Sequence, residues 1–249
     1  MKDSPNQSIA RAIQILHAVA ASPEGLTAQE MAELLQVSRP TAHNIATSLL
    51  NESFLIKHNK PVRYTIGPAP GRIAKGAQLQ QRQLQAKELM QIHSRQHPGT
   101  GWVYAEAGDD DMRVIWRMDF KRPEVIDRVD REISHPYDAA TALLFHAFAD
   151  ETKTEALRRR YPFPEFGLSI WKSREDFQQY LKKIRNEGYV NKPWSTHREL
   201  GAIAVPIFNQ HHVLIGSIGA FFPINKFAKF SEDLLATVQA SALTLGAHE

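Results

Sequence analysis

Residues 26–50 of the chain, LTAQEMAELLQVSRPTAHNIATSLL, contain two short helix signals separated by a turn of about four residues. Thr27 and Glu30 have the spacing of a capping box, which predicts the start of the first helix. Ser38 is a favourable N-cap for the second helix, and the first turn of a helix tolerates Pro40. Two short helices joined in this way are typical of a helix-turn-helix.

The residues on either side of this stretch extend the pattern. On the N-terminal side, apolar residues recur at helical spacing and predict a buried helix face made of Ile9, Ile13, Leu16 and Ala20. That helix should end at Ser22-Pro23. On the C-terminal side, residues 54–56 and 62–66 are β-branched and aromatic runs around a basic tip, which predicts a hairpin. Three helices followed by a hairpin indicate a winged helix-turn-helix.

The second helix of the motif has a polar outward face of mostly short side chains. A helix of this kind fits the DNA major groove, where Arg, Asn and Thr read base edges. We therefore expect DNA contacts from Ser38, Arg39, Thr41, His43, Asn44 and Thr47. At the hairpin, Lys57, Lys60 and Arg63 are expected to reach phosphates or a minor groove. A solvated helix face, a charged hairpin or a protein-binding module would have similar sequences.

Composition and charge narrow the class of protein. The chain has 249 residues and no cysteine, which excludes a disulfide framework, a thiolate nucleophile and a cysteine-ligated zinc site. It contains no signal-peptide pattern and no apolar run long enough for a membrane span, so we expect a cytoplasmic protein and no membrane partner. The formal net charge of +3 is matched by residues 1–75 alone, which fits a segment that meets a polyanion and equally fits a solvated surface.

The remainder of the chain divides into a connecting helix and a mixed domain. Residues 67–71, GPAPG, mark the exit from the first domain, and the glutamine-rich residues 72–97 predict a linker helix. From residue 98 to 249 the pattern is α+β on an antiparallel-rich sheet. The expected strands are 102–105, 113–118, 202–208 and 213–221, and the expected helices are 138–149, 174–186 and 232–245. The predicted domains are thus 1–71, 72–97 and 98–249.

These motifs, in this order, resemble those of the IclR family of transcriptional regulators. The matching pieces are SIARAIQIL, residues 26–50, YTIGPAPGRIAKG, PGTGWVYAEAGDDDMRVIWRMDF, IRNEGYV, and ELGAIAVPIF with HHVLIGSIGAFFP. The resemblance runs from about residue 8 to residue 246. It implies a winged helix-turn-helix, a linker helix and a GAF/PAS-like effector-binding domain that also contributes oligomer contacts. The implied function is a ligand-responsive regulator of double-stranded operator DNA, acting as a homodimer or a dimer of dimers.

The chain departs from the family pattern where a ligand is expected. Members often carry a P-L-H-A-T-A-x-G-K segment, whereas residues 136–144 read PYDAATALL, with Asp138 in place of the histidine. The hydroxyl residues that accompany small-acid sensing are also missing before Pro223, which disfavours a small anionic effector. We expect the effector to be an aromatic or other semi-polar metabolite, and the regulated genes to form a catabolic operon. The candidate pocket residues are Asp138, Thr141, Trp194, His197, Glu199, Ala202, Ser217, Gly219 and Phe221.

The sequence contains no enzyme or metal signature that we recognise. His93 and His97 have helical i, i+4 spacing without a third ligand nearby, and no nucleophile elbow or phosphate-binding glycine loop is present. We expect no catalytic residue, no metal and no cofactor. Two other functions remain open, namely a DNA-binding architectural protein without a ligand and an enzyme fused to a DNA-binding domain.

Overall fold

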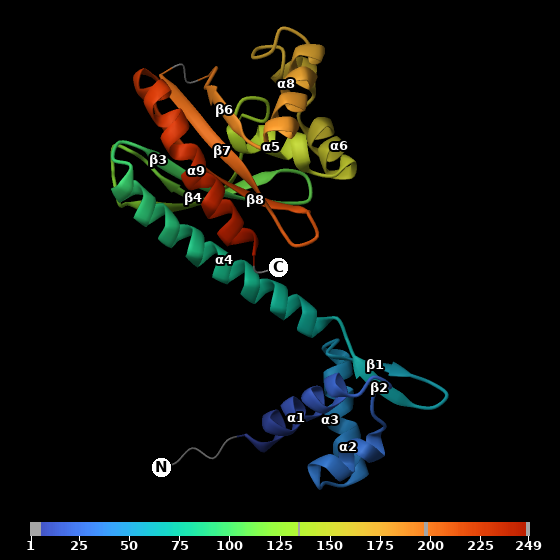
Figure 1. The fold of residues 1–249 in the computed structure, drawn as a ribbon. Coiled ribbons are helices and arrows are strands. Elements are labelled where there is room, and N and C mark those ends of the chain that lie inside the picture. The colour runs from blue at the N-terminus through green and yellow to red at the C-terminus, as the bar shows by residue number, and fades with distance from the viewer. Residues whose placement is uncertain (1–5, 134, 197–198, 248–249) are drawn as a thin grey trace. The chain divides into compact units, whose positions relative to one another are not determined.

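The computed structural model describes residues 6–133, 135–196 and 199–247 (Figure 1). It divides into two compact units, Met1–Leu79 and Gln80–Glu249. Within the described residues, no helix is both long enough and apolar enough to span a bilayer.

The first unit has the predicted order of three helices and a hairpin. Its elements are α1 (Gln7–Ala21), α2 (Ala28–Leu35), α3 (Arg39–Asn51), β1 (Leu55–His58) and β2 (Arg63–Ile66). The capping box is formed, because the backbone N–H of Thr27 donates to Glu30 Oε2 over 2.6 Å and the N–H of Glu30 donates to Thr27 Oγ1 over 3.2 Å. Ser38 caps α3 by accepting from the N–H of Thr41 at 3.3 Å. The predicted winged helix-turn-helix is confirmed.

The buried face of α1 differs from the prediction. Ile15 and Val19 are buried in the core of the first unit, and Leu16 packs beside them. Ile9 and Ile13 are 59% and 49% exposed, and Ala20 is also exposed, so the predicted stripe was wrong for these three residues. The apolar positions of α1 cover more than one face of the helix, and periodicity alone selected the wrong one.

Helix α4 (Ala69–Gln96) begins in the first unit and ends in the second. The part of α4 that belongs to the second unit, from Gln80 onward, is attached to the sheet of that unit by a partly buried polar network. Arg82 Nε donates to the hydroxyl of Tyr104 at 3.0 Å, and that hydroxyl donates to Glu106 Oε1 at 2.9 Å. Gln83 Nε2 donates to both carboxylate oxygens of Glu106 at 3.1 Å. Burial raises the pKa of Glu106 above its usual value, and the hydrogen bonds from Tyr104 and Gln83 offset only part of this effect.

The second unit is an α+β domain built on a six-stranded antiparallel sheet of order β5-β4-β3-β8-β7-β6. The strands are β3 (Gly101–Ala107), β4 (Met112–Met118), β5 (Ile126–Glu132), β6 (Val190–Pro193), β7 (Leu200–Phe208) and β8 (Leu214–Pro223). The helices are α5 (Ala140–Phe148), α6 (Glu151–Arg160), α7 (Phe163–Phe166), α8 (Arg174–Glu187) and α9 (Phe227–Gly246), with a 3₁₀ turn at Ile224–Lys226.

Helices cover both faces of this sheet. Figure 1 shows α9 lying across β7 and β8 on one face, with α5 and α8 on the other. Side chains on the central strands alternate accordingly. Ile203 and Phe222 belong to the core under α9, whereas Ala202, Ala204 and Phe221 belong to the core under α5. The alternation matters for function because the α5 face contains the candidate effector pocket.

Candidate functional site

The outward surface of α3 holds the predicted base-reading residues. Ala42 and Ala46 are completely buried, so α3 packs closely against its own unit on that side. On the other side Arg39, His43, Asn44 and Thr47 are exposed, with Thr41 half-buried. The hydroxyl of Ser38 is used by the helix cap, and that of Thr47 donates to the carbonyl of His43 at 2.9 Å. His43 Nδ1 lies 3.4 Å from the hydroxyl of Tyr64, so Arg39 and Asn44 have the freest polar side-chain groups among the described residues of the set.

The three basic residues predicted to contact DNA from the hairpin differ in exposure and in their contacts. Lys57 and Lys60 are exposed and available to a phosphate. Arg63 is half-buried, and its Nη1 donates to the carbonyl of Gly25 at 2.7 Å and lies 3.5 Å from Glu30 Oε2. Arg63 thus links the hairpin to the start of α2. The sequence shows its charge but not this long-range contact.

On the α5 face of the sheet, a cavity of about 70 Å³ brings together four of the predicted effector residues. These are Thr141, Trp194, Ala202 and Phe221. The rings of Trp194 and Phe221 are nearly parallel, with centroids 6.5 Å apart. Phe120 meets Phe221 edge-on at 6.0 Å. Aromatic and small apolar side chains thus form most of the wall, which suits a flat ligand.

Two arginines that carry no local sequence signal for a ligand site also line this cavity. Arg117 lies with its guanidinium carbon 4.4 Å from the centroid of Phe221, and Arg131 comes from the neighbouring strand β5. Burial, together with the charge of Arg131, lowers the pKa of Arg117, while Asp119 raises it. Strict alternation cannot place Arg117, because a bulge between Val114 and Trp116 lets Val114 and Arg117 line the same cavity.

Asp138 stands beside this pocket rather than in its wall. It is fully buried and accepts from Lys192 Nζ at 2.7 Å, from the N–H groups of Ser195 and Thr196 at 3.2 and 2.8 Å, and from Thr196 Oγ1 at 2.8 Å. Burial alone would raise the pKa of Asp138, but these hydrogen bonds and the charge of Lys192 lower it to about 2. Asp138 therefore fixes the segment after β6, which carries Trp194.

The other predicted pocket residues do not line the cavity. Ser217 is fully buried, paired in the sheet with Ala105 and Pro206, and its hydroxyl has no hydrogen-bond partner in the described part of the chain. Gly219 is a packing position, since a Cβ there would lie 2.5 Å from the carbonyl of Ile203. Glu199 is exposed. His197 lies outside the described residues.

The histidine pair considered as a metal site has structural partners instead. His93 Nε2 lies 2.8 Å from Ser241 Oγ, and the ring of His93 lies 5.2 Å from that of Trp102. His97 lies just beyond the end of α4 and 3.3 Å from Thr237 Oγ1. Among the residues that the structure describes, no group of three or more His, Asp and Glu side chains could hold a metal ion.

Comparison with known proteins agrees with this arrangement. Residues 8–57 match the IclR helix-turn-helix domain, and residues 133–247 match the IclR C-terminal domain of bacterial transcriptional regulators. The chain is 28% identical over 184 residues to the HTH-type transcriptional regulator TtgV of Pseudomonas putida, which covers 73% of this chain and 69% of that protein.

Solved structures share the fold. The IclR transcriptional regulator of Alicyclobacillus acidocaldarius is 22% identical, covers 98% of both chains and has a TM-score of 0.54. HmgR of Pseudomonas aeruginosa is 19% identical, covers 97% of this chain and 98% of its own, and has a TM-score of 0.51.

A winged helix-turn-helix followed by this α+β domain defines a DNA-binding transcriptional regulator. The two family matches together span more than half of the chain, and the protein belongs to the IclR family of transcriptional regulators rather than to a class of enzymes.

Proposed function

We propose that the protein senses an aromatic or semi-polar metabolite through the pocket on the α5 face, and that this ligand changes its affinity for operator DNA of a catabolic operon. The observation that supports the proposal most directly is the stack of Trp194 and Phe221 with Arg117 over the ring of Phe221. Aromatic walls select a flat ligand. Glu132 also lines the cavity but is already paired with Arg160 and Arg113, so Arg117 and Arg131 favour a ligand with a carboxylate or phenolate.

The size of the cavity suggests how binding is coupled to a change in the protein. An apolar cavity of about 150 Å³ admits a benzene ring. The cavity here is about 70 Å³, so its wall must open before a ring can enter. A ligand that binds only the opened form shifts the population toward that form. We propose that this opening is the step by which the effector acts on DNA binding.

The experiment that tests the sensor is a thermal-unfolding screen of the whole protein with phenols, aromatic acids, ring-cleavage products and short oxo-acids. A ligand at 100 times its Kd stabilises the folded protein by about 2.7 kcal/mol, which is readily detected. We expect stabilisation by aromatic compounds and weaker effects of oxo-acids. Binding of oxo-acids alone would reject the aromatic pocket. A protein that binds specific DNA but responds to no compound would be a regulator without a ligand.

We also propose that the protein acts as a homodimer or a dimer of dimers on paired half-sites, because one helix-turn-helix contacts few bases. An oligomer would cover apolar residues that are exposed in the single chain. These are Ile9 and Ile13 on α1 and Leu243 on α9, and the side chain of Leu243 is 77% exposed. Under this proposal residues 1–71 bind DNA, residues 72–97 connect, and residues 98–249 bind effector and partner subunits, in the cytoplasm.

Two substitutions separate base reading from phosphate contact. Arg39→Ala is expected to cost about 1–3 kcal/mol on the specific site and to relax its selectivity, because Arg39 is exposed at the start of α3. Lys60→Ala is expected to weaken binding to all duplexes alike and to reduce the salt slope by about one. Anisotropy titrations on a selected and a random duplex at several salt concentrations measure both. Equal losses on both duplexes for both variants would contradict the assignment.

A further inference from the structure

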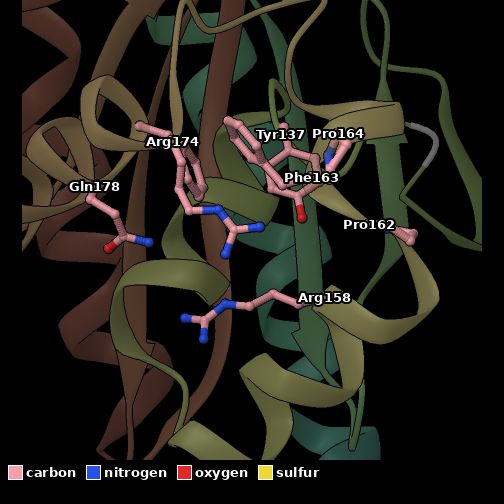
Figure 2. A pocket seen from close by; sticks show the side chains of 8 residues that line it. Tyr137, Arg158, Pro162, Phe163, Pro164, Arg174 and Gln178 are labelled. Carbon is pink, nitrogen blue, oxygen red and sulfur yellow. The ribbon is translucent and has the colours of Figure 1, made fainter.

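A second cavity, of about 130 Å³, lies among the helices α6, α7 and α8 (Figure 2). Its lining residues are Tyr137, Arg158, Pro162, Phe163, Pro164, Arg174, Phe177 and Gln178. None of them lines the effector pocket. The cavity approaches the roughly 150 Å³ that admits a benzene ring, so a ligand of that size needs little rearrangement to enter.

Three packed aromatic rings form part of the lining of this cavity. Phe163, Phe177 and Tyr137 are each less than about a tenth exposed, and their rings pack with centroids 5.2–5.6 Å apart. The hydroxyl of Tyr137 already donates to the carbonyl of Tyr161 at 2.7 Å, so Tyr137 presents its ring rather than a free donor. A flat apolar body would find stacking partners here.

The mouth of the cavity is cationic. Figure 2 shows Arg158, Arg174 and Gln178 extending toward one another on one side of the cavity. The guanidinium carbon of Arg174 lies 5.5 Å from the ring centroid of Phe163. Within the described residues, no carboxylate lies within ion-pair distance of Arg174. Arg158 pairs with Glu151 at 2.8 Å, but Glu151 is 72% exposed, so this pair contributes little and can be exchanged. No acidic side chain lines the cavity within the described part of the chain.

We propose that this cavity is a second ligand site, which binds a small organic carboxylate with a flat apolar body. The carboxylate would accept hydrogen bonds from the guanidinium groups of Arg174 and Arg158, and the body would lie against Phe163 and Tyr137. Guanidinium groups match the planar geometry of a carboxylate. Tyr137 also precedes the segment 139–141 that lines the effector pocket, so the two sites share one stretch of backbone.

The four tryptophans of the chain allow a test that distinguishes the two sites. Trp171 Nε1 donates to the carbonyl of Tyr137 at 2.8 Å, beside the second cavity, and Trp194 lines the effector pocket. In the intact protein labelled with 5-fluorotryptophan, a titration with benzoate is followed by fluorine NMR, with signals assigned by Trp→Phe variants. We expect a saturable shift of the Trp171 signal, at concentrations about tenfold lower than inorganic phosphate or phenol requires.

Matched variants decide the assignment. Arg174→Gln is expected to weaken the benzoate-dependent shift of Trp171 about tenfold or more, and Arg174→Lys to retain part of it. Arg159→Gln is the control, since Arg159 lies one residue from Arg158, is 75% exposed and does not line the cavity. Unchanged binding in Arg174→Gln, or a shift confined to Trp194, would overturn the second site. In Arg117→Gln the Trp171 shift should persist, because Arg117 lines the effector pocket and not this cavity. The test of the second site is therefore independent of the test of the effector pocket.

Discussion

Replacing Asp138 with asparagine is expected to lower the free energy of unfolding of the second unit by about 3–5 kcal/mol, because it leaves a largely buried cation without its partner. Lys192 is only 12% exposed and lies 2.7 Å from the Asp138 carboxylate. Asparagine also offers one acceptor oxygen where the carboxylate serves three neighbouring residues, Lys192, Ser195 and Thr196. The segment that carries Trp194 should loosen as a result.

Urea unfolding followed by tryptophan fluorescence measures this loss, because all four tryptophans lie in the second unit. Asp127→Asn is the matched control: its ion pair with Arg122 is exposed and should contribute less than about 1 kcal/mol. The double variant Asp138→Asn, Lys192→Met should recover part of the loss, since it removes the unpaired charge. Equal unfolding curves for Asp138→Asn and Asp127→Asn would show that the buried pair does not hold this segment.

Acid should also remove the contribution of the Asp138 carboxylate to the free energy of unfolding. The pKa of Asp138 is about 2 in the folded protein and about 3.9 in an unfolded chain, so the unfolded state binds the proton more tightly. The stabilisation is therefore complete above about pH 5 and is lost as pH falls through 4 toward 2. The Asp138→Asn variant should show a smaller dependence of its stability on pH in that range than the unsubstituted protein.

Replacing Phe221 with alanine is expected to weaken binding of an aromatic effector about tenfold or more while leaving DNA binding without ligand intact. Phe221 supplies the ring that Trp194, Phe120 and Arg117 all contact, so its loss removes the main stacking surface of the pocket. Phe221 is 3% exposed, and the truncation should also cost about 3–5 kcal/mol of stability. Isothermal titration calorimetry with an aromatic hit measures the affinity.

Phe222→Ala separates the ligand effect from the stability effect. Phe222 is equally buried but faces α9, away from the pocket, so it should lose stability without losing ligand affinity. Phe221→Leu keeps most of the buried volume and should fold while still binding poorly. Equal ligand affinities for Phe221→Leu and the unsubstituted protein would make Phe221 a core residue only.

The sequence predicts the first unit well because its signals are local. The capping box at Thr27 and the N-cap at Ser38 act within one helical turn, and both form as expected. Strand β5 was not predicted, because its sequence IDRVDRE resembles a charged surface segment. It is an edge strand next to β4, where charged side chains stay solvated and protect the open edge from further pairing.

The pocket was only partly predictable because its wall depends on contacts between distant strands. Strand alternation placed Ala202 and Phe221 on the correct face, but it cannot show that Ser217 and Gly219 lie too deep under the packing of neighbouring strands to reach a ligand. Arg117 depends on a bulge, and the role of Asp138 depends on Lys192, which is 54 residues away in the chain. None of these relations leaves a local sequence signal.

We expect an aromatic ligand in the pocket of the second unit to change the affinity of the protein for DNA. Anisotropy titration tests this with a duplex selected in vitro for tight binding, with and without a saturating aromatic hit from the screen, for the unsubstituted protein and Phe221→Leu. We predict that the ligand changes the Kd of the unsubstituted protein about 5- to 150-fold and that of Phe221→Leu much less. An unchanged Kd in the unsubstituted protein, with ligand bound at saturation, would contradict the account.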